Sequence, residues 1–168
     1  MRKLVLLGLV VAMGGCGDTV EPTTTTISVT TMDSAGGTIV GQGAVAGVEL
    51  VMPFGALTQS TPVYLGEDPQ PPDDPPGMTP ASPSVLLSPE GLTLLRPATL
   101  VIPYTGLSDV FLYTAPAVDG FPWQLVDGAQ PDITQNVMRG SVPHFSRWRV
   151  FRPTNPADVD GGNPDAGS

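Results

Sequence analysis

Short apolar runs separated by turn-forming residues constrain the fold of this chain more than any other feature. Between residues 27 and 152 each run spans at most about six residues, the usual length of a strand, before Gly, Pro or another turn former interrupts it. The chain holds 20 glycines and 20 prolines among 168 residues, which leaves little room for long helices. Such spacing is typical of all-β sandwiches and barrels. We therefore predict one all-β domain over residues 27–152, an antiparallel β-sandwich.

Nine short strands are predicted within this domain. They cover residues 37–40, 48–52, 62–65, 84–87, 98–102, 110–114, 123–126, 137–141 and 147–151. The second and fifth of them combine alternation with nearly continuous apolarity, as expected of strands between two packed layers. Pro53, Pro97 and Pro103 fall at predicted strand ends, where a missing N–H costs little.

The N-terminus has the organisation of a secretory signal peptide. A basic start, Met1 to Lys3, precedes the ten-residue apolar run Leu4 to Met13 and the small pair Gly14-Gly15. A ten-residue helix spans roughly 15 Å, about half of a bilayer core, so the run is too short for a transmembrane helix. We predict a signal peptide over residues 1–15.

Cys16, the one cysteine of the chain, follows this signal directly. The stretch Ala12-Met13-Gly14-Gly15-Cys16 resembles a bacterial lipobox, in which the cysteine becomes the lipidated N-terminus. Several acyl chains on one residue make membrane attachment stable. We predict a lipoprotein of the cell envelope, anchored at the periplasmic face or cell surface, with inner and outer membrane both open. The alternative is a free thiol behind an ordinary signal peptide.

Two polar segments flank the predicted sandwich. Residues 16–26 are rich in Thr and suit an extended stalk, and residues 153–168 are acidic, rich in Pro and Gly, and lack large apolar side chains. We expect both to be disordered. Asp158, Asp160 and Asp165 with Asn163 superficially resemble a calcium loop, but the spacing and closing Glu of an EF-hand are missing.

The longest insert without predicted strands is the segment 66–83. It sets Glu67, Asp68, Asp73 and Asp74 among seven prolines. Polyproline II geometry would hold these carboxylates out in water. A stiff solvated loop is the preferred interpretation, and a protein-binding ridge or a weak calcium site are the alternatives.

Charge and residue usage exclude several function classes. Seven basic residues face sixteen acidic ones, a net charge of −9, which becomes −11 once Arg2 and Lys3 leave with the signal peptide. Such a charge repels nucleic acid and anionic lipid. One His and one Cys are too few for a His/Cys zinc site, an iron–sulfur cluster or a Cys–His enzyme. We expect no cofactor, no metal and no nucleic-acid partner.

Several ordered motifs resemble one known domain family. Gly36-Gly37-Thr38-Ile39-Val40 and the run 47–57 resemble the opening of the domain shared by zonula occludens proteins, Unc-five netrin receptors and ankyrins, the ZU-five domain. The run 86–103 resembles its central part, and His144-Phe145-Ser146 its closing segment, so the resemblance spans roughly 36 to 151. It implies a β-sandwich that makes protein contacts and names no particular ligand.

The triplet His144-Phe145-Ser146 also looks like the self-cleavage triplet of some family members. There Ser146 Oγ would attack the Phe145 carbonyl, His144 would take the proton as general base, and water would release the ester. Strand alternation predicts that Arg147 and Arg149 face out, so His144 and Ser146 would face in and Phe145 out. A buried Phe145 therefore requires a β-bulge. The preferred interpretation of the triplet is structural, with self-cleavage as the alternative.

Four of the five arginines outside the signal peptide cluster near the end of the domain. They are Arg139, Arg147, Arg149 and Arg152, with Trp148 among them. They either pair with the acids of the domain itself, which we favour, or form a partner-binding face.

These features predict a membrane-anchored lipoprotein whose sandwich is a non-catalytic interaction or structural module of the cell envelope. Its expected partners are the membrane, through Cys16, and an envelope or extracellular protein. One alternative is a self-cleaving domain cut between Phe145 and Ser146. A further alternative is a calcium-stabilised adhesion module.

Overall fold

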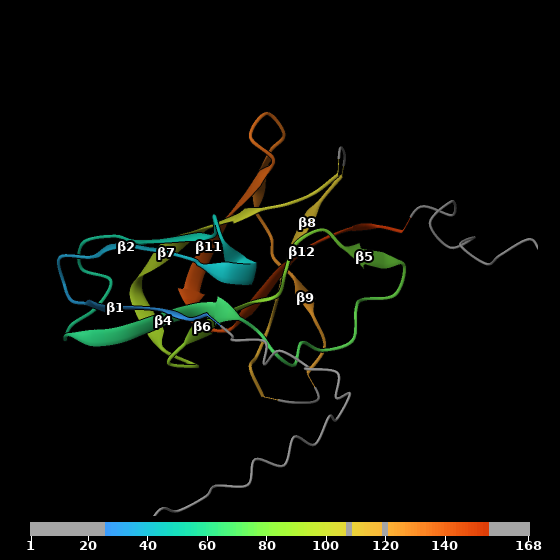
Figure 1. The fold of residues 1–168 in the computed structure, drawn as a ribbon. Helices are drawn as coiled ribbons and strands as arrows, with labels where there is room; N and C mark the ends of the chain where they lie inside the picture. The colour runs from blue at the N-terminus through green and yellow to red at the C-terminus, as the bar shows by residue number, and fades with distance from the viewer. Residues whose placement is uncertain (1–25, 107–108, 119–120, 155–168) are drawn as a thin grey trace, which may run out of the picture.

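The computed structural model describes residues 26–106, 109–118 and 121–154 (Figure 1). The predicted signal peptide, Cys16 and all of the stalk but Thr26 lie outside these residues, as does the predicted tail from residue 155 on. No helix among the described residues is long and apolar enough to cross a membrane.

Twelve strands and one short 3-10 turn make up the described fold. They are β1 (Ser28–Met32), β2 (Gly37–Val40), η1 (Gly43–Val45), β3 (Glu49–Met52), β4 (Thr61–Glu67), β5 (Met78–Pro80), β6 (Val85–Ser88), β7 (Thr93–Pro103), β8 (Phe111–Ala115), β9 (Gln124–Leu125), β10 (Gln130–Asp132), β11 (Val137–His144) and β12 (Arg147–Pro153).

The strands form two antiparallel sheets. One has the order β1-β4-β6-β12-β8-β9, with β5 also paired to β12, and the other has the order β10-β11-β7-β3-β2. Figure 1 shows β2, β7 and β11 in one layer, facing β1, β4 and β6 in the other. The all-β prediction is confirmed.

Each of the nine predicted strands overlaps an observed one, but three more strands exist. These are β1, β5 and β10, of which β5 lies within the segment predicted to lack strands. The predicted lengths were wrong for β4, β7, β11 and β12, which span seven, eleven, eight and seven residues. Pro97 lies inside β7, not at a strand end. Pro97 has no N–H to donate to a neighbouring strand. It lies next to Ala98, the partner of Val142 on β11, at the point where the pairing of β7 with β11 becomes irregular, so no ladder hydrogen bond from Pro97 is needed.

The main core lies between the two sheets. Its largest fully buried side chains include Trp148, Phe145, Leu50, Leu65 and Leu100. A Cβ at Gly140 would meet the end of the Leu112 side chain, which would have to shift to make room for it.

A second, smaller cluster lies on the other side of β12. It consists of Ala115, Trp123 and Phe151, with Met78 and Tyr113 packed against it. The rings of Tyr113 and Phe151 meet edge to face, with centroids 5.2 Å apart. Because both faces of β12 are covered, this strand does not have the half-exposed pattern that alternation alone predicts.

Candidate functional site

The segment from Asp68 to Ser84, here called the proline loop, is tied to β12 by two ion pairs. Arg147 Nε lies 3.1 Å from Asp68 Oδ2, and Arg149 Nη1 lies 3.3 Å from Asp74 Oδ1. The prediction that the arginines pair with the domain's own acids is confirmed for these two residues. The prediction that all the loop carboxylates extend into water was wrong for Asp68, which is 5 % exposed.

Burial of Asp68 is accompanied by hydrogen bonds at both carboxylate oxygens. Gln70 N–H donates to Oδ1 at 3.1 Å, and Ser84 Oγ donates to Oδ2 at 3.3 Å. The Asp68 backbone N–H donates to the Ser84 carbonyl at 2.9 Å. A buried carboxylate needs partners of this kind, because burial without them costs several kcal/mol, roughly 1–3 for each missing bond. This network closes the base of the proline loop.

Strand alternation predicts that the Arg147 side chain faces solvent, and this prediction was wrong. Arg147 and Arg149 lie on the side of β12 away from the main core, but Arg147 is only 6 % exposed, and its guanidinium contacts Asp68 of the proline loop and the Pro116 carbonyl. Trp148 points into the main core and is 1 % exposed. A partner-binding face built on this tryptophan is therefore wrong.

Trp123 ties the proline loop to the segment that precedes β9. Its indole N–H donates to the Pro72 carbonyl at 3.2 Å, and its ring packs edge to face on Phe151 with centroids 5.5 Å apart. Phe121 and Pro122 come directly before it in the chain. One buried side chain thus holds two surface segments at a defined separation.

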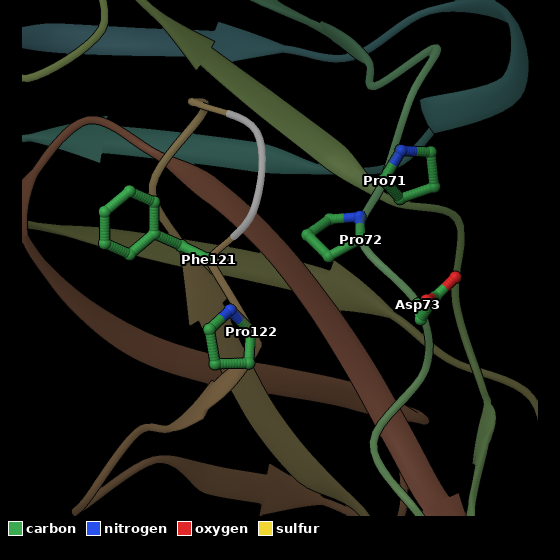
Figure 2. A pocket seen from close by; sticks show the side chains of 5 residues that line it. All are labelled: Pro71, Pro72, Asp73, Phe121 and Pro122. Carbon is green, nitrogen blue, oxygen red and sulfur yellow. The ribbon is translucent and has the colours of Figure 1, made fainter.

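Between these two segments lies a surface hollow of about 400 Å³, here called the proline hollow. It is lined by Pro71, Pro72, Asp73, Phe121 and Pro122. Figure 2 shows Phe121 and Pro122 on one wall and Pro71 and Pro72 on the other, with Asp73 beside Pro72. The Phe121 side chain is 50 % exposed. Of these residues the sequence singled out only Asp73, although the aromatic and proline cluster at 121–123 was a visible signal.

The triplet lies at the point where the chain crosses from one sheet to the other. His144 ends β11, Arg147 begins β12, and Phe145 and Ser146 span the connection. The pairing of β11 with β7 shifts register between Val142 and His144, just before Phe145, and Phe145 is 1 % exposed. Its N–H donates to the Leu92 carbonyl at 2.9 Å, and its own carbonyl accepts from Gly91 N–H at 3.1 Å.

His144 and Ser146 differ in their surroundings. Ser146 is buried as predicted, whereas His144 is exposed, so the alternation of β11 is broken where its register to β7 shifts. Thr114 Oγ1 donates to the Arg147 carbonyl at 2.9 Å and lies 2.8 Å from Ser146 Oγ. Since Thr114 has one hydroxyl proton, the Ser146 hydroxyl donates to Thr114. In this arrangement Ser146 completes a local network at the sheet crossing.

Among the described residues, no three His, Cys, Asp or Glu side chains gather closely enough to hold a metal ion. The acidic residues considered for calcium at 158–165 lie outside that part of the chain.

Comparison with known proteins identifies one family. The model of the ZU5 domain matches residues 28–110, which run from β1 to the residue before β8. No curated protein matches the chain. The later strands belong to the same two sheets, with β12 in the middle of one of them. The triplet lies beyond the matched range. The chain therefore carries a ZU5 domain, a β-sandwich interaction module, at residues 28–110.

Proposed function

We propose that this protein is a non-catalytic interaction or structural module of the bacterial cell envelope, held at the membrane by lipidated Cys16. The basic start, short apolar run and small pair before the lone cysteine support the anchor. The ZU5 domain supports the interaction role.

The observation that carries the interaction role is the pinned proline loop beside an exposed aromatic ring. Ion pairs at Asp68 and Asp74 and the hydrogen bond from Trp123 fix the backbone of the loop. A surface that is already ordered loses little conformational entropy when a partner binds. Aromatic side chains are also enriched in protein interfaces. The proline hollow is therefore the face where we place partner contact.

Metabolic labelling of the full chain tests the anchor. Cells that express the chain are fed an alkyne fatty acid, and the membrane fraction is then coupled to a fluorophore. We expect label on the wild-type protein and none on Cys16→Ala, which retains the apolar run of the signal. Equal labelling of the two proteins, or no label on either, would contradict lipidation at Cys16.

Site-specific photo-crosslinking in intact cells tests the interaction role. A benzoyl-phenylalanine placed at Phe121 should give a discrete adduct of higher mass after illumination. The matched control places the same group at Phe54, which is 71 % exposed in the turn after β3 and does not line the proline hollow. Absence of an adduct at both positions contradicts the interaction role, and an adduct only at Phe54 contradicts its placement at the hollow.

Self-cleavage between Phe145 and Ser146 is the second candidate function. The hydrogen bond from Gly91 N–H to the Phe145 carbonyl favours it, because a fixed donor there stabilises the oxyanion that forms on attack. Ser146 Oγ would bond to the Phe145 carbonyl carbon as the peptide C–N bond breaks and the Ser146 nitrogen gains a proton. Water would then hydrolyse the ester to a Phe145 carboxylate and the free Ser146 hydroxyl. His144 would have to reach the Ser146 proton that Thr114 now accepts.

A denaturing intact mass of the full chain tests this candidate, beside Ser146→Ala. A fragment that begins at Ser146 and disappears in the variant would establish self-processing. A single intact mass in both proteins over several days would contradict it.

A further inference from the structure

We propose that the proline hollow receives one basic side chain, Lys or Arg, from the partner protein. This inference rests on the proposed interaction role and specifies the chemistry that the partner presents. Three observations carry it: a carboxylate with no ion pair among the described residues, the lack of donor groups on the described lining side chains, and apolar surface suited to a long aliphatic stem.

The first observation concerns three acids of the proline loop. Asp68 and Asp74 are each paired with an arginine of β12. Asp73, which lies between them in the sequence, is exposed, lines the hollow, and has no ion pair or side-chain hydrogen bond within the described part of the chain. An exposed aspartate turns readily between rotamers, so its carboxylate can orient toward a cation in the hollow.

The second observation concerns hydrogen bonding. Pro71, Pro72 and Pro122 carry no backbone N–H, and the Phe121 side chain has no polar atom. The Pro72 carbonyl already accepts the Trp123 indole N–H. The polar groups that the lining side chains present to a ligand are thus acceptors, and the strongest is a carboxylate. Lys and Arg side chains are donors only, so they complement this lining, whereas a carboxylate ligand would be repelled.

The third observation concerns the walls. Pro71 and Pro72 on one side, and Phe121 and Pro122 on the other, contribute apolar side chains to the lining of the hollow (Figure 2). The methylene stem of Lys or Arg packs on such surface while its charged end stays at a polar rim. The face of the phenyl ring attracts the cation as well. A volume of about 400 Å³ suits one side chain with its neighbouring backbone.

Overall charge agrees with this assignment. The chain has a net charge of −9, and Arg147 and Arg149, which contact the proline loop, are paired with Asp68 and Asp74. A basic partner is therefore attracted at long range and meets an unpaired carboxylate at the hollow.

A peptide pair tests the proposal on the full chain in detergent micelles. The probe is acetyl-Ala-Pro-Arg-Pro-Ala-amide, and its control contains citrulline, which has the shape of arginine without its charge. The two tryptophans provide the readout by NMR. The Trp123 indole N–H borders the hollow, whereas Trp148 is buried in the main core and serves as an internal reference.

We expect the arginine peptide to shift the Trp123 indole signal in a saturable way and to leave Trp148 unchanged. The citrulline peptide should bind at least about 10-fold more weakly, and raised salt should weaken the arginine peptide only. Asp73→Asn should weaken the arginine peptide about 10-fold, and Phe121→Leu by about 2- to 5-fold. Glu90→Gln, an equal charge change at an exposed residue outside the hollow, should leave binding unchanged.

Equal binding of the two peptides, or an unchanged affinity in Asp73→Asn, would overturn the proposal that the hollow receives a basic side chain. So would no response of Trp123 to either peptide. None of these results tests the interaction role itself. The photo-crosslink at position 121 tests that role, and it does not depend on the charge of the partner. A crosslink without arginine selectivity therefore contradicts this inference alone.

Discussion

The sheet crossing at Phe145-Ser146 and the proline hollow both contain side chains capable of reaction or binding. The two regions differ in whether those side chains already have partners within the domain. At the crossing, the Phe145 N–H and carbonyl, the Ser146 carbonyl and the Ser146 hydroxyl all have partners within the domain. At the hollow, the Asp73 carboxylate and the Phe121 ring remain open to solvent, while their neighbours Asp68, Trp123 and Asp74 are fixed.

This difference separates residues that maintain the fold from residues that remain available to a ligand. A polar group that already has buried partners must lose them before it can act, at a cost of about 1–3 kcal/mol. An exposed carboxylate on a fixed backbone has no such cost. The predictions below test whether the two regions differ in this way, beginning with the largest expected effect.

Phe145→Ala should reduce the free energy of unfolding by about 3–5 kcal/mol, because it opens a cavity in the main core. The matched change Phe121→Ala removes a half-exposed ring and should cost less than about 1 kcal/mol. Urea unfolding followed by tryptophan fluorescence measures both. Phe145→Leu, which keeps most of the volume, provides a folded variant if the alanine variant does not fold. Equal losses for Phe145→Ala and Phe121→Ala would refute the contrast.

Asp68→Asn should cost about 3 kcal/mol, since it removes the charge of the carboxylate that lies against the buried Arg147 guanidinium. Asp73→Asn, the same change five residues along the proline loop, should alter stability by less than about 0.5 kcal/mol. Chemical denaturation of the two variants side by side checks this. A loss of similar size for Asp73→Asn would show that the Asp73 carboxylate has a stabilising partner within the domain.

Trp123→Phe should cost about 1 kcal/mol and loosen the proline loop, because the donor to the Pro72 carbonyl is removed. Trp148→Phe is the control, as its buried indole nitrogen has no hydrogen-bond partner within the described structure. Amide hydrogen exchange at Gln70 and Asp73 should accelerate in the first variant only. Faster exchange in both would mean that global stability, not the tie to Pro72, controls the loop.

Asp74→Asn should have the smallest effect, about 0.2–1 kcal/mol, because the Arg149–Asp74 pair is partly exposed. The difference from wild type should shrink further at high salt, which screens exposed charges. Unfolding at low and high sodium chloride measures both values. A salt-independent loss comparable to that of Asp68→Asn would contradict the surface character of this pair.

Most of the fold was predictable because apolar runs and turn residues are local signals. Gly55 and Gly91 lie at positive φ in turns after β3 and before β7, a backbone region that glycine adopts without steric cost. β1, β5 and β10 were missed because they are short, polar or proline-bearing, and a partner strand defines each of them. β5 pairs only with the end of β12, more than seventy positions later in the chain.

The candidate site was predictable only in part. The acidic and proline-rich composition of the loop marked it as notable, and the arginine–acid pairing followed from charge. Which acid would pair with which arginine depended on the course of the proline loop over β12. For the same reason, the sequence did not distinguish buried Asp68 from exposed Asp73, although both stand among the same residue types.

The sequence by itself determined that this domain is all-β and antiparallel, that its acids outnumber its bases, and that Phe145 requires a bulge if it is buried. Each of these follows from local spacing or from counting charges. Only the tertiary structure decided that the proline loop contacts β12, that Trp123 joins two distant segments, and that Asp73 and Phe121 line the same hollow. Those outcomes depend on contacts between residues far apart in the chain, and no local pattern specifies such contacts.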